Sequence, residues 1–194
     1  MPRAATGAIR CIVGIGNPTD QYANTKHNVG WWVVDELASR HNVHMKRERL
    51  RAIYGRGRIG GLDIVLAKPT TYVNLTGDAA LRLAIFFGIK PSEFLVVLDD
   101  MNLPTGQIRL RRDGSDGGHK GLRSMIQTFG TMEIPRLRIG IGAPEGRGGG
   151  VDWVLTPFDK ETMPLIQDAV KRAGDCIETI LKDGLEIAMT KYNG

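Results

Sequence analysis

The architecture of the chain follows from Ile12-Val-Gly-Ile-Gly-Asn-Pro18 and from Thr25-Lys-His-Asn-Val-Gly-Trp31 shortly after it. The first segment is a short, β-branched apolar run that ends in glycine, asparagine and proline, which is typical of a buried strand followed by a turn. The second segment brings His27 to the start of an amphipathic helix predicted over 30–41. A strand, a loop and a helix therefore meet near one histidine. Open α/β sheets collect their ligand-binding and catalytic groups at such junctions.

The glycines of the first segment do not form a nucleotide-binding motif. Gly14 and Gly16 begin like G-x-G-x-x-G, but Thr19 stands where the third glycine is needed, and Pro18 interrupts the turn. No helix is predicted to start directly after them, so the helix N-terminus that would hold a phosphate is missing. The sequence also lacks G-x-x-x-x-G-K-[ST], and no nucleotide cofactor is expected.

Composition and length bound the class of protein. The 194 residues alternate strand-like with helix-like segments, which predicts one α/β domain over 1–194 with 1–8 as a flexible N-terminal tail. The net charge of +5 suits an anionic partner but is weak evidence alone. Cys11 and Cys176 lie in apolar patterns and are predicted to be buried free thiols. The sequence shows no secretory signal and no apolar run of about 18 residues, so a cytoplasmic location without a membrane partner is expected.

The local patterns predict the elements. Strands are predicted over 10–15, 53–59, 62–67, 94–98, 107–112 and 136–141, and helices over 30–41, 74–87, 122–129 and 160–182. Asn74 is placed to N-cap the second helix. The charged segment 46–52 is predicted to be solvated surface, and the glycine-rich segment 113–121 to be a flexible loop.

Polar residues stand at the ends of predicted strands and at the starts of predicted helices. In a doubly wound sheet, Asn17, His27, Asn74, Asp99 and His119 would lie along one rim. A helix N-terminus disfavours a protonated His27, and Asp99 would fix its tautomer and stabilise the cation formed during catalysis. Since there is no G-x-S-x-G elbow and neither cysteine lies near a loop, a histidine–aspartate pair that activates water is favoured over a covalent mechanism. The two asparagines would orient substrate or water.

Each of these residues also has a simpler explanation. Asn17-Pro18 is a common turn dipeptide, and Asn74 is a helix cap by default. Asp99-Asp100 can be strand-end charges or a metal site, although no histidine or glutamate stands at ligand spacing. The arginines of 107–112 and 136–141 can form a solvated sheet face. The residue patterns alone indicate an α/β protein, with a hydrolase as one interpretation.

Six segments in order, within about residues 9 to 190, resemble the bacterial-type peptidyl-tRNA hydrolase family. They are Val13–Pro18, Tyr22–Gly30, Lys68–Gly77, Leu98–Gly106, Gly117–Leu122 and Arg136–Gly142. The resemblance implies one α/β domain with a twisted mixed, largely parallel β-sheet surrounded by α-helices. It implies an enzyme that hydrolyses the ester between a peptide and the 3′-terminal ribose of tRNA, with water and without a metal or other cofactor, and so recycles tRNA from stalled translation.

The resemblance also assigns roles by matching position. His27 corresponds to the catalytic base and Asp99 to its carboxylate partner. Asn17 and Asn74 correspond to the amides that bind the peptide and place the water. Tyr22 corresponds to a residue in the cleft near the 3′ end of the tRNA.

Further positions correspond to contacts with the RNA and with the substrate. His119 matches a substrate-contacting residue in the gate loop, and Arg111 and Arg138 match basic positions that hold tRNA phosphate. Such contacts give affinity without reading sequence, as an enzyme that serves all tRNAs needs. The implied partner is the acceptor stem and 3′ end of peptidyl-tRNA, bound by a monomer.

Two substrate-binding positions depart from the family pattern. Lys120 replaces an asparagine of the gate loop, and Val73 replaces a methionine of the peptide cleft. A non-catalytic RNA-binding protein, like the plastid splicing cofactors that resemble this family, is the alternative. Loss of the histidine, aspartate and asparagine set would favour it, and that set is intact here.

Overall fold

The computed structural model describes residues 8–146 and 149–194, so most of the predicted N-terminal tail, residues 1–7, lies outside it. Its centre is one sheet with the strand order β2-β3-β4-β1-β5-β7-β6. The strands are β1 (Cys11–Gly14), β2 (Arg47–Arg49), β3 (Ala52–Ile59), β4 (Leu62–Pro69), β5 (Phe94–Asp100), β6 (Ile108–Arg111) and β7 (Arg136–Gly140). The four adjacent strands β4, β1, β5 and β7 are parallel, and β2, β3 and β6 add antiparallel pairs. The predicted mixed, largely parallel sheet is confirmed.

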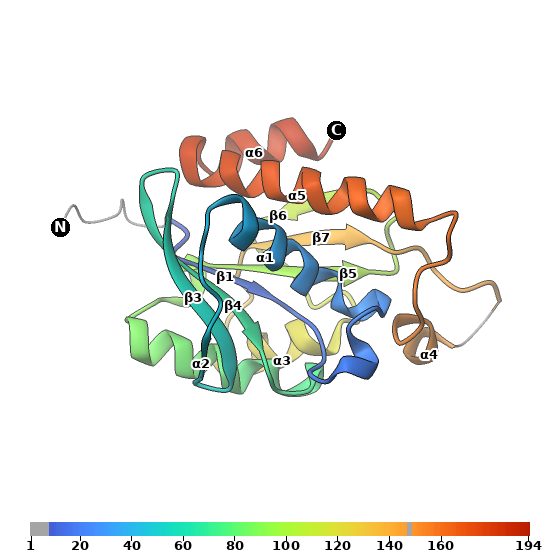
Figure 1. Ribbon diagram of the computed structural model, residues 1–194, viewed down its shortest axis with the longest axis horizontal. Coiled ribbons are helices and arrows are strands. Elements are labelled where there is room, and N and C mark those ends of the chain that lie inside the picture. The colour runs from blue at the N-terminus through green and yellow to red at the C-terminus, as the bar shows by residue number, and fades with distance from the viewer. Residues whose placement is uncertain (1–7, 147–148) are drawn as a thin grey trace.

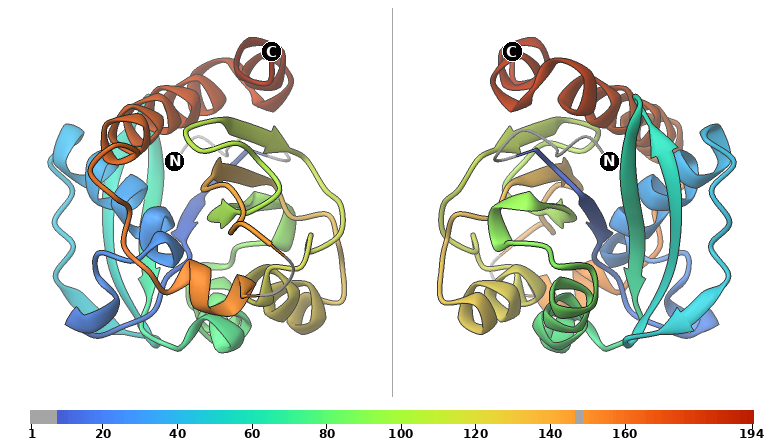
Figure 2. Two further views of the ribbon diagram at one scale, coloured as in Figure 1. Left: turned by 90° about the vertical axis from the view of Figure 1, so that its right-hand side faces the viewer. Right: turned by 90° about the vertical axis from the view of Figure 1, so that its left-hand side faces the viewer.

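Helices cover both faces of this sheet, as Figures 1 and 2 show. They are α1 (Val29–Arg40), α2 (Thr76–Phe87), α3 (Lys120–Phe129), α4 (Gly150–Val154), α5 (Met163–Asp183) and α6 (Leu185–Tyr192). α1, α5 and α6 pack on one face, while α2 and α3 pack on the other. In the described part of the chain, no helix is long and apolar enough to cross a membrane.

The two faces of the sheet are filled by alternating residues of the same strands. Ile12 of β1 joins the core beneath α1 and α5, whereas its neighbours Cys11 and Val13 join the core beneath α2 and α3. This period of two follows from the pleat, and burial on both faces explains why β1 is apolar throughout. Cys11 and Cys176 are both buried and free, as predicted, and burial raises the pKa of each thiol.

A close approach between β1 and α1 sets the position of the first helix. A Cβ atom on Gly14 would lie 2.2 Å from the carbonyl oxygen of Gly30, and one on Gly30 would lie 2.4 Å from the carbonyl oxygen of Val97. Only residues without a side chain allow these backbones to come so near. The turn before α1 is therefore held against the carboxyl ends of β1 and β5.

The structure departs from what the sequence led us to expect in three places. Within 46–52, Arg47–Arg49 forms the edge strand β2, although the exposed Glu48 and Arg49 agree with a solvated surface. Helix α6 follows α5 after Gly184 and is not anticipated. Asn74 is not a helix cap: it lies inside a 3₁₀ turn, Val73–Leu75, and α2 begins after Leu75.

Candidate active site

The carboxyl ends of the parallel strands open into one cavity of about 740 Å³. All of the predicted site residues except Tyr22 line it, so the rim expected from the sequence is formed. They are Asn17, His27, Val73, Asn74, Asp99, Arg111, His119, Lys120 and Arg138. Tyr22 ends a 3₁₀ turn after β1 and is half-buried outside this lining.

His27 and Asp99 form the centre of the site. A hydrogen bond of 2.8 Å joins His27 Nδ1, in the 3₁₀ turn Lys26–Asn28, to Asp99 Oδ1 near the end of β5. Burial acts to raise the pKa of Asp99, but the charges of His119 and His27 and their hydrogen bonds outweigh it and hold that pKa well below its usual range. Asp99 is therefore a carboxylate that only accepts hydrogen bonds. It follows that His27 Nδ1 donates and that the lone pair of Nε2 is available to take a proton.

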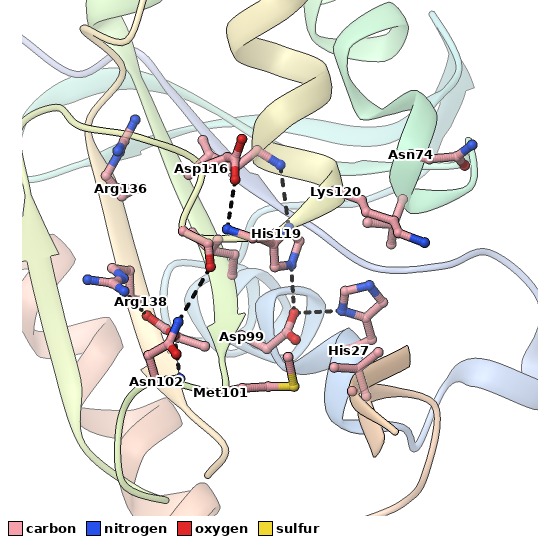
Figure 3. Close-up of a pocket in the computed structure, with 18 of the residues that line it drawn as sticks. His27, Asn74, Asp99, Met101, Asn102, Asp116, His119, Lys120, Arg136 and Arg138 are labelled. Atoms are coloured by element: carbon pink, nitrogen blue, oxygen red, sulfur yellow. Dashed lines mark hydrogen bonds and ion pairs between the residues drawn. The ribbon is translucent and has the colours of Figure 1, made fainter. Parts of the chain in front are cut away.

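His119 binds the same carboxylate oxygen, and its ring lies beside that of His27. Its Nε2 lies 2.9 Å from Asp99 Oδ1, and its ring centroid is 4.9 Å from that of His27. Its Nδ1 accepts from the backbone N–H groups of Gly121 at 3.1 Å and Leu122 at 3.4 Å, so the imidazole caps α3. Both nitrogens of His119 are thus engaged within the protein. Figure 3 shows the bonds from one oxygen of Asp99 to the two imidazoles.

The same three residues raise the question of a metal ion. Donor atoms of His27, Asp99 and His119 lie within 4.8 Å of one another, a spacing that suits a metal. However, the helix cap makes Nδ1 of His119 an acceptor, which leaves the proton of the neutral ring on Nε2. Nε2 then has no lone pair to give to a metal. In this arrangement the cluster does not offer three ligands to a metal ion.

Two asparagines fasten the loop after β1 to the turn that carries His27. Asn28 Oδ1 accepts from Asn17 N–H at 2.9 Å, and Asn28 Nδ2 donates to the Asn17 carbonyl at 3.0 Å. Asn17 Oδ1 in turn accepts from Val73 N–H at 3.0 Å. The Nδ2 group is what Asn17 can still offer to a ligand. Asn28 is fully buried and was missed by sequence reasoning, since its only signal is its place beside His27.

Asn74 and Lys120 are exposed side chains on the His27 side of the cavity, as Figure 3 shows. Asn74 projects from the 3₁₀ turn, and Lys120 is the first residue of α3. Neither side chain has a hydrogen bond within the described residues. Both are available to a bound molecule.

Arginines gather on the other side of Asp99 (Figure 3). Arg111 is exposed at the end of β6, whereas Arg138 pairs with Asp100. Arg136 does not belong to a solvated face: it is 2% exposed and donates to the carbonyls of Gly114 at 2.8 Å and Ser115 at 3.2 Å. Its burial lowers its pKa. Its structural role was missed because an arginine on a strand is by default a solvated residue.

The glycine-rich loop is anchored where it approaches His119. Gly117 and Gly118 have φ angles of 58° and 88°, which favour glycine. Asp116 accepts from the N–H of Gly118 at 2.7 Å and, through its backbone carbonyl, from His119 N–H at 2.9 Å. Asn102 Nδ2 donates to the Gly117 carbonyl at 3.4 Å. These bonds fix the backbone that presents His119 to Asp99.

Comparison with known proteins identifies the family of the chain. The profile of the family described as "Peptidyl-tRNA hydrolase" matches residues 11–194. Peptidyl-tRNA hydrolases of Syntrophomonas wolfei and of a Sulfurihydrogenibium species are 44% and 45% identical to the chain, over 95% of it and over 100% and 97% of their own lengths. The crystal structure of peptidyl-tRNA hydrolase from Acinetobacter baumannii superposes with a TM-score of 0.93 at 33% identity, covering 99% of this chain and 98% of that one. The chain belongs to the peptidyl-tRNA hydrolase family.

Proposed function

We propose that the cavity hydrolyses the ester between a peptide and the 3′-terminal ribose of tRNA with His27 as general base. The observation that carries this proposal is the bond from His27 Nδ1 to Asp99, while Nε2 has no hydrogen bond to any described residue and His27 lines the cavity. A neutral imidazole held in this way accepts a proton from water, and the adjacent carboxylate stabilises the imidazolium that forms.

The reaction has two steps in this proposal. His27 Nε2 takes a proton as the oxygen of water attacks the ester carbonyl carbon, which gives a tetrahedral intermediate. The bond from that carbon to the ribose 3′ oxygen then breaks, and the imidazolium returns the proton to this oxygen. Asn17, Asn74 and Lys120 lie where they can orient the peptide and the water and stabilise developing negative charge.

The two sides of the cavity suit the two parts of the substrate. Apolar residues next to His27 and Asn74, among them Tyr72, Val73 and Val154, offer contacts to a peptide. Arg138 lies on the opposite side in Figure 3, and together with Arg111, which also lines the cavity, it offers charge to the phosphates of the acceptor stem and 3′ end. Contact of Tyr22 and His119 with the substrate also belongs to the proposal. Tyr22 lies outside the residues that line the cavity, whereas His119 lines it and binds Asp99.

The proposal includes a monomer that works in the cytoplasm and recycles tRNA from stalled translation. Peptidyl-tRNA arises where ribosomes work. His27, its partner Asp99 and the His119 that also binds Asp99 all come from one chain, so the site does not need a second copy. Light scattering at micromolar concentration tests this part, and a dimer would contradict it.

Release of labelled peptide from peptidyl-tRNA, measured in a chelator, tests the proposed function. We expect turnover by the wild type and a fall of about 10²- to 10⁴-fold for His27→Ala, because general base catalysis contributes that much. Binding of tRNA should change little, since His27 makes no phosphate contact in the proposal. His41→Ala is the matched control, because His41 pairs with Glu178 on the surface.

Three outcomes would contradict the proposal. Turnover near the wild-type rate in His27→Ala would remove His27 as the base. Turnover abolished by the chelator would show that a metal is needed. Binding of tRNA without any turnover by the wild type would favour a non-catalytic RNA-binding protein.

A further inference from the structure

Lys26, the residue before His27, is a buried lysine. It is 5% exposed, and its ammonium Nζ donates to Thr156 Oγ1 at 2.8 Å and to the carbonyl of Pro157 at 2.7 Å. The same Nζ lies 3.9 Å from the centre of the Trp153 ring and 5.3 Å from that of Phe158. Two neutral oxygens and two aromatic faces therefore enclose one positive charge.

This arrangement is unusual for a structural lysine. Within the described residues no carboxylate lies within 4 Å of Nζ, so the buried charge has no ion-pair partner. Burial accordingly lowers the pKa of Lys26, with Asp159 opposing the shift from a distance. An apolar side chain of similar length would fill the same space without the desolvation penalty of a charge. What the ammonium provides, and an apolar side chain could not, are its hydrogen bonds and cation–π contacts with residues of the 153–158 segment.

Those bonds join the turn of His27 to one wall of the cavity. Backbone contacts join the same two segments: Lys26 N–H donates to the Thr156 carbonyl at 3.0 Å, and Thr25 forms a β-bridge with Pro157. Immediately before Thr156 stand Val154 and Leu155, which line the cavity at the end of α4. One side chain thus connects the catalytic turn to a surface that a substrate would touch.

We propose that Lys26 is a positioning residue for His27, which fixes the direction of the imidazole by tying the Lys26–Asn28 turn to the 153–158 segment. The inference rests on the proposed role of His27 as base. His27 sits on a single turn of 3₁₀ helix, and Asp99 holds its ring through one hydrogen bond only. A misplacement of about 1 Å in such a group can reduce a rate about 100-fold.

The test compares Lys26→Met, which keeps the length and loses the donors, with Lys26→Arg, which can donate to the same oxygens and stack on Trp153. Lys68→Met is the matched control, because Lys68 binds Asp35 at 2.6 Å and lies over the ring of Trp31 without touching the 153–158 segment. Each variant is assayed for kcat and KM with peptidyl-tRNA well below its melting temperature. The ¹⁵N shifts of the His27 ring report the tautomer.

We expect Lys26→Met to lower kcat about 10- to 100-fold and to mix the two His27 tautomers, while KM changes less. Lys26→Arg should recover much of the loss, and Lys68→Met should behave as the wild type. A lower melting temperature with unchanged kcat and unchanged ring shifts would overturn the inference. If Lys26→Met does not fold, Thr156→Val removes one acceptor and must show the same changes in smaller size. If the wild type has no turnover, the proposed function fails, and the ring shifts still decide the role of Lys26.

Discussion

Asp99 accepts hydrogen bonds from two histidines through one oxygen, and this shared atom determines how the site responds to acid. The pKa of Asp99 is lowered in the folded protein, whereas the pKa of an aspartate in an unfolded chain is about 3.9. Below that pH the unfolded chain binds more protons than the folded one, so the stability from Asp99 is complete above about pH 4 and is lost as the pH falls further.

We predict that Asp99→Asn removes part of this acid dependence. Urea unfolding of the wild type between about pH 5 and pH 2.5 should show stability falling with pH, and the slope should be shallower for Asp99→Asn, which does not titrate there. Asp63→Asn serves as the control, because Asp63 is an exposed aspartate that lies opposite Arg58 in the β3–β4 hairpin. Parallel curves for the wild type and Asp99→Asn would contradict the prediction.

At this scale the sequence predicts part of the site. His27, Asn17 and Asp99 stand at junctions between elements, and that placement suffices to bring them to one rim. The second bond of Asp99 is not predictable in this way, because it depends on the cap that His119 makes for α3. Asn74 shows the opposite error: its type suits a helix cap, but a 3₁₀ turn moves the helix start to Leu75–Thr76.

At the scale of elements, the contact of α1 with the sheet is the feature that places the catalytic turn. We predict that Gly30→Ala destabilises the protein by about 1–3 kcal/mol, since its Cβ would meet the backbone oxygens of Val97 and Ile15 within 2.8 Å. Without that clash, alanine would favour a helix over glycine by about 1 kcal/mol. Activity should fall as well, because α1 begins two residues after His27.

Gly174→Ala in α5 is the matched control for Gly30→Ala. The nearest atoms to its Cβ would belong to the guanidinium of Arg40, at 2.9 Å, and not to the backbone. That guanidinium could shift only by weakening its bonds to Asp175 and to the Lys171 carbonyl. We therefore expect thermal unfolding to show a smaller loss for Gly174→Ala than for Gly30→Ala. Equal losses in the two variants would mean that backbone contact is not what sets the position of α1.

Elements with strong periodicity are predicted well, and those without it are not. The buried strands, the glycine turn between β3 and β4 and the apolar stripe of α5 carry their own signals. β2 is only three residues long and is made of charged residues, so its pairing with β3 supplies the strand. α6 follows α5 after the single residue Gly184, and Ala188 is its one buried residue, so it has no apolar stripe that could have predicted it.

At the scale of the molecule, the positive charges beside the cavity allow a test of RNA binding. Arg111 is exposed and has no ion pair within the described residues, whereas Arg138 shares its charge with Asp100. We predict that Arg111→Ala weakens tRNA binding at low salt and reduces the slope of log K against log salt by about 1. A filter-binding series across salt concentrations measures both quantities.

Arg58→Ala is the control for the RNA prediction. Arg58 is equally charged and exposed, but it lies near the turn between β3 and β4, at the sheet edge opposite the cavity. It should leave the affinity and the salt slope unchanged. Equal effects of Arg111→Ala and Arg58→Ala would mean that overall charge, and not the cavity, attracts the RNA.

The bonds that hold His27 span long distances along the chain, and this matters while the protein is being made. Asp99 follows His27 by 72 positions, and the Thr156 that binds Lys26 follows it by 130. A growing chain emerges from its N-terminus first, so His27 is made long before the residues that bind its turn. Until it is released, that chain is itself a peptide esterified to tRNA. The contacts of this turn with Asp99 and with the 156–157 segment are therefore complete only after residue 157 has left the ribosome, so under the proposed mechanism an unfinished chain lacks the assembled site.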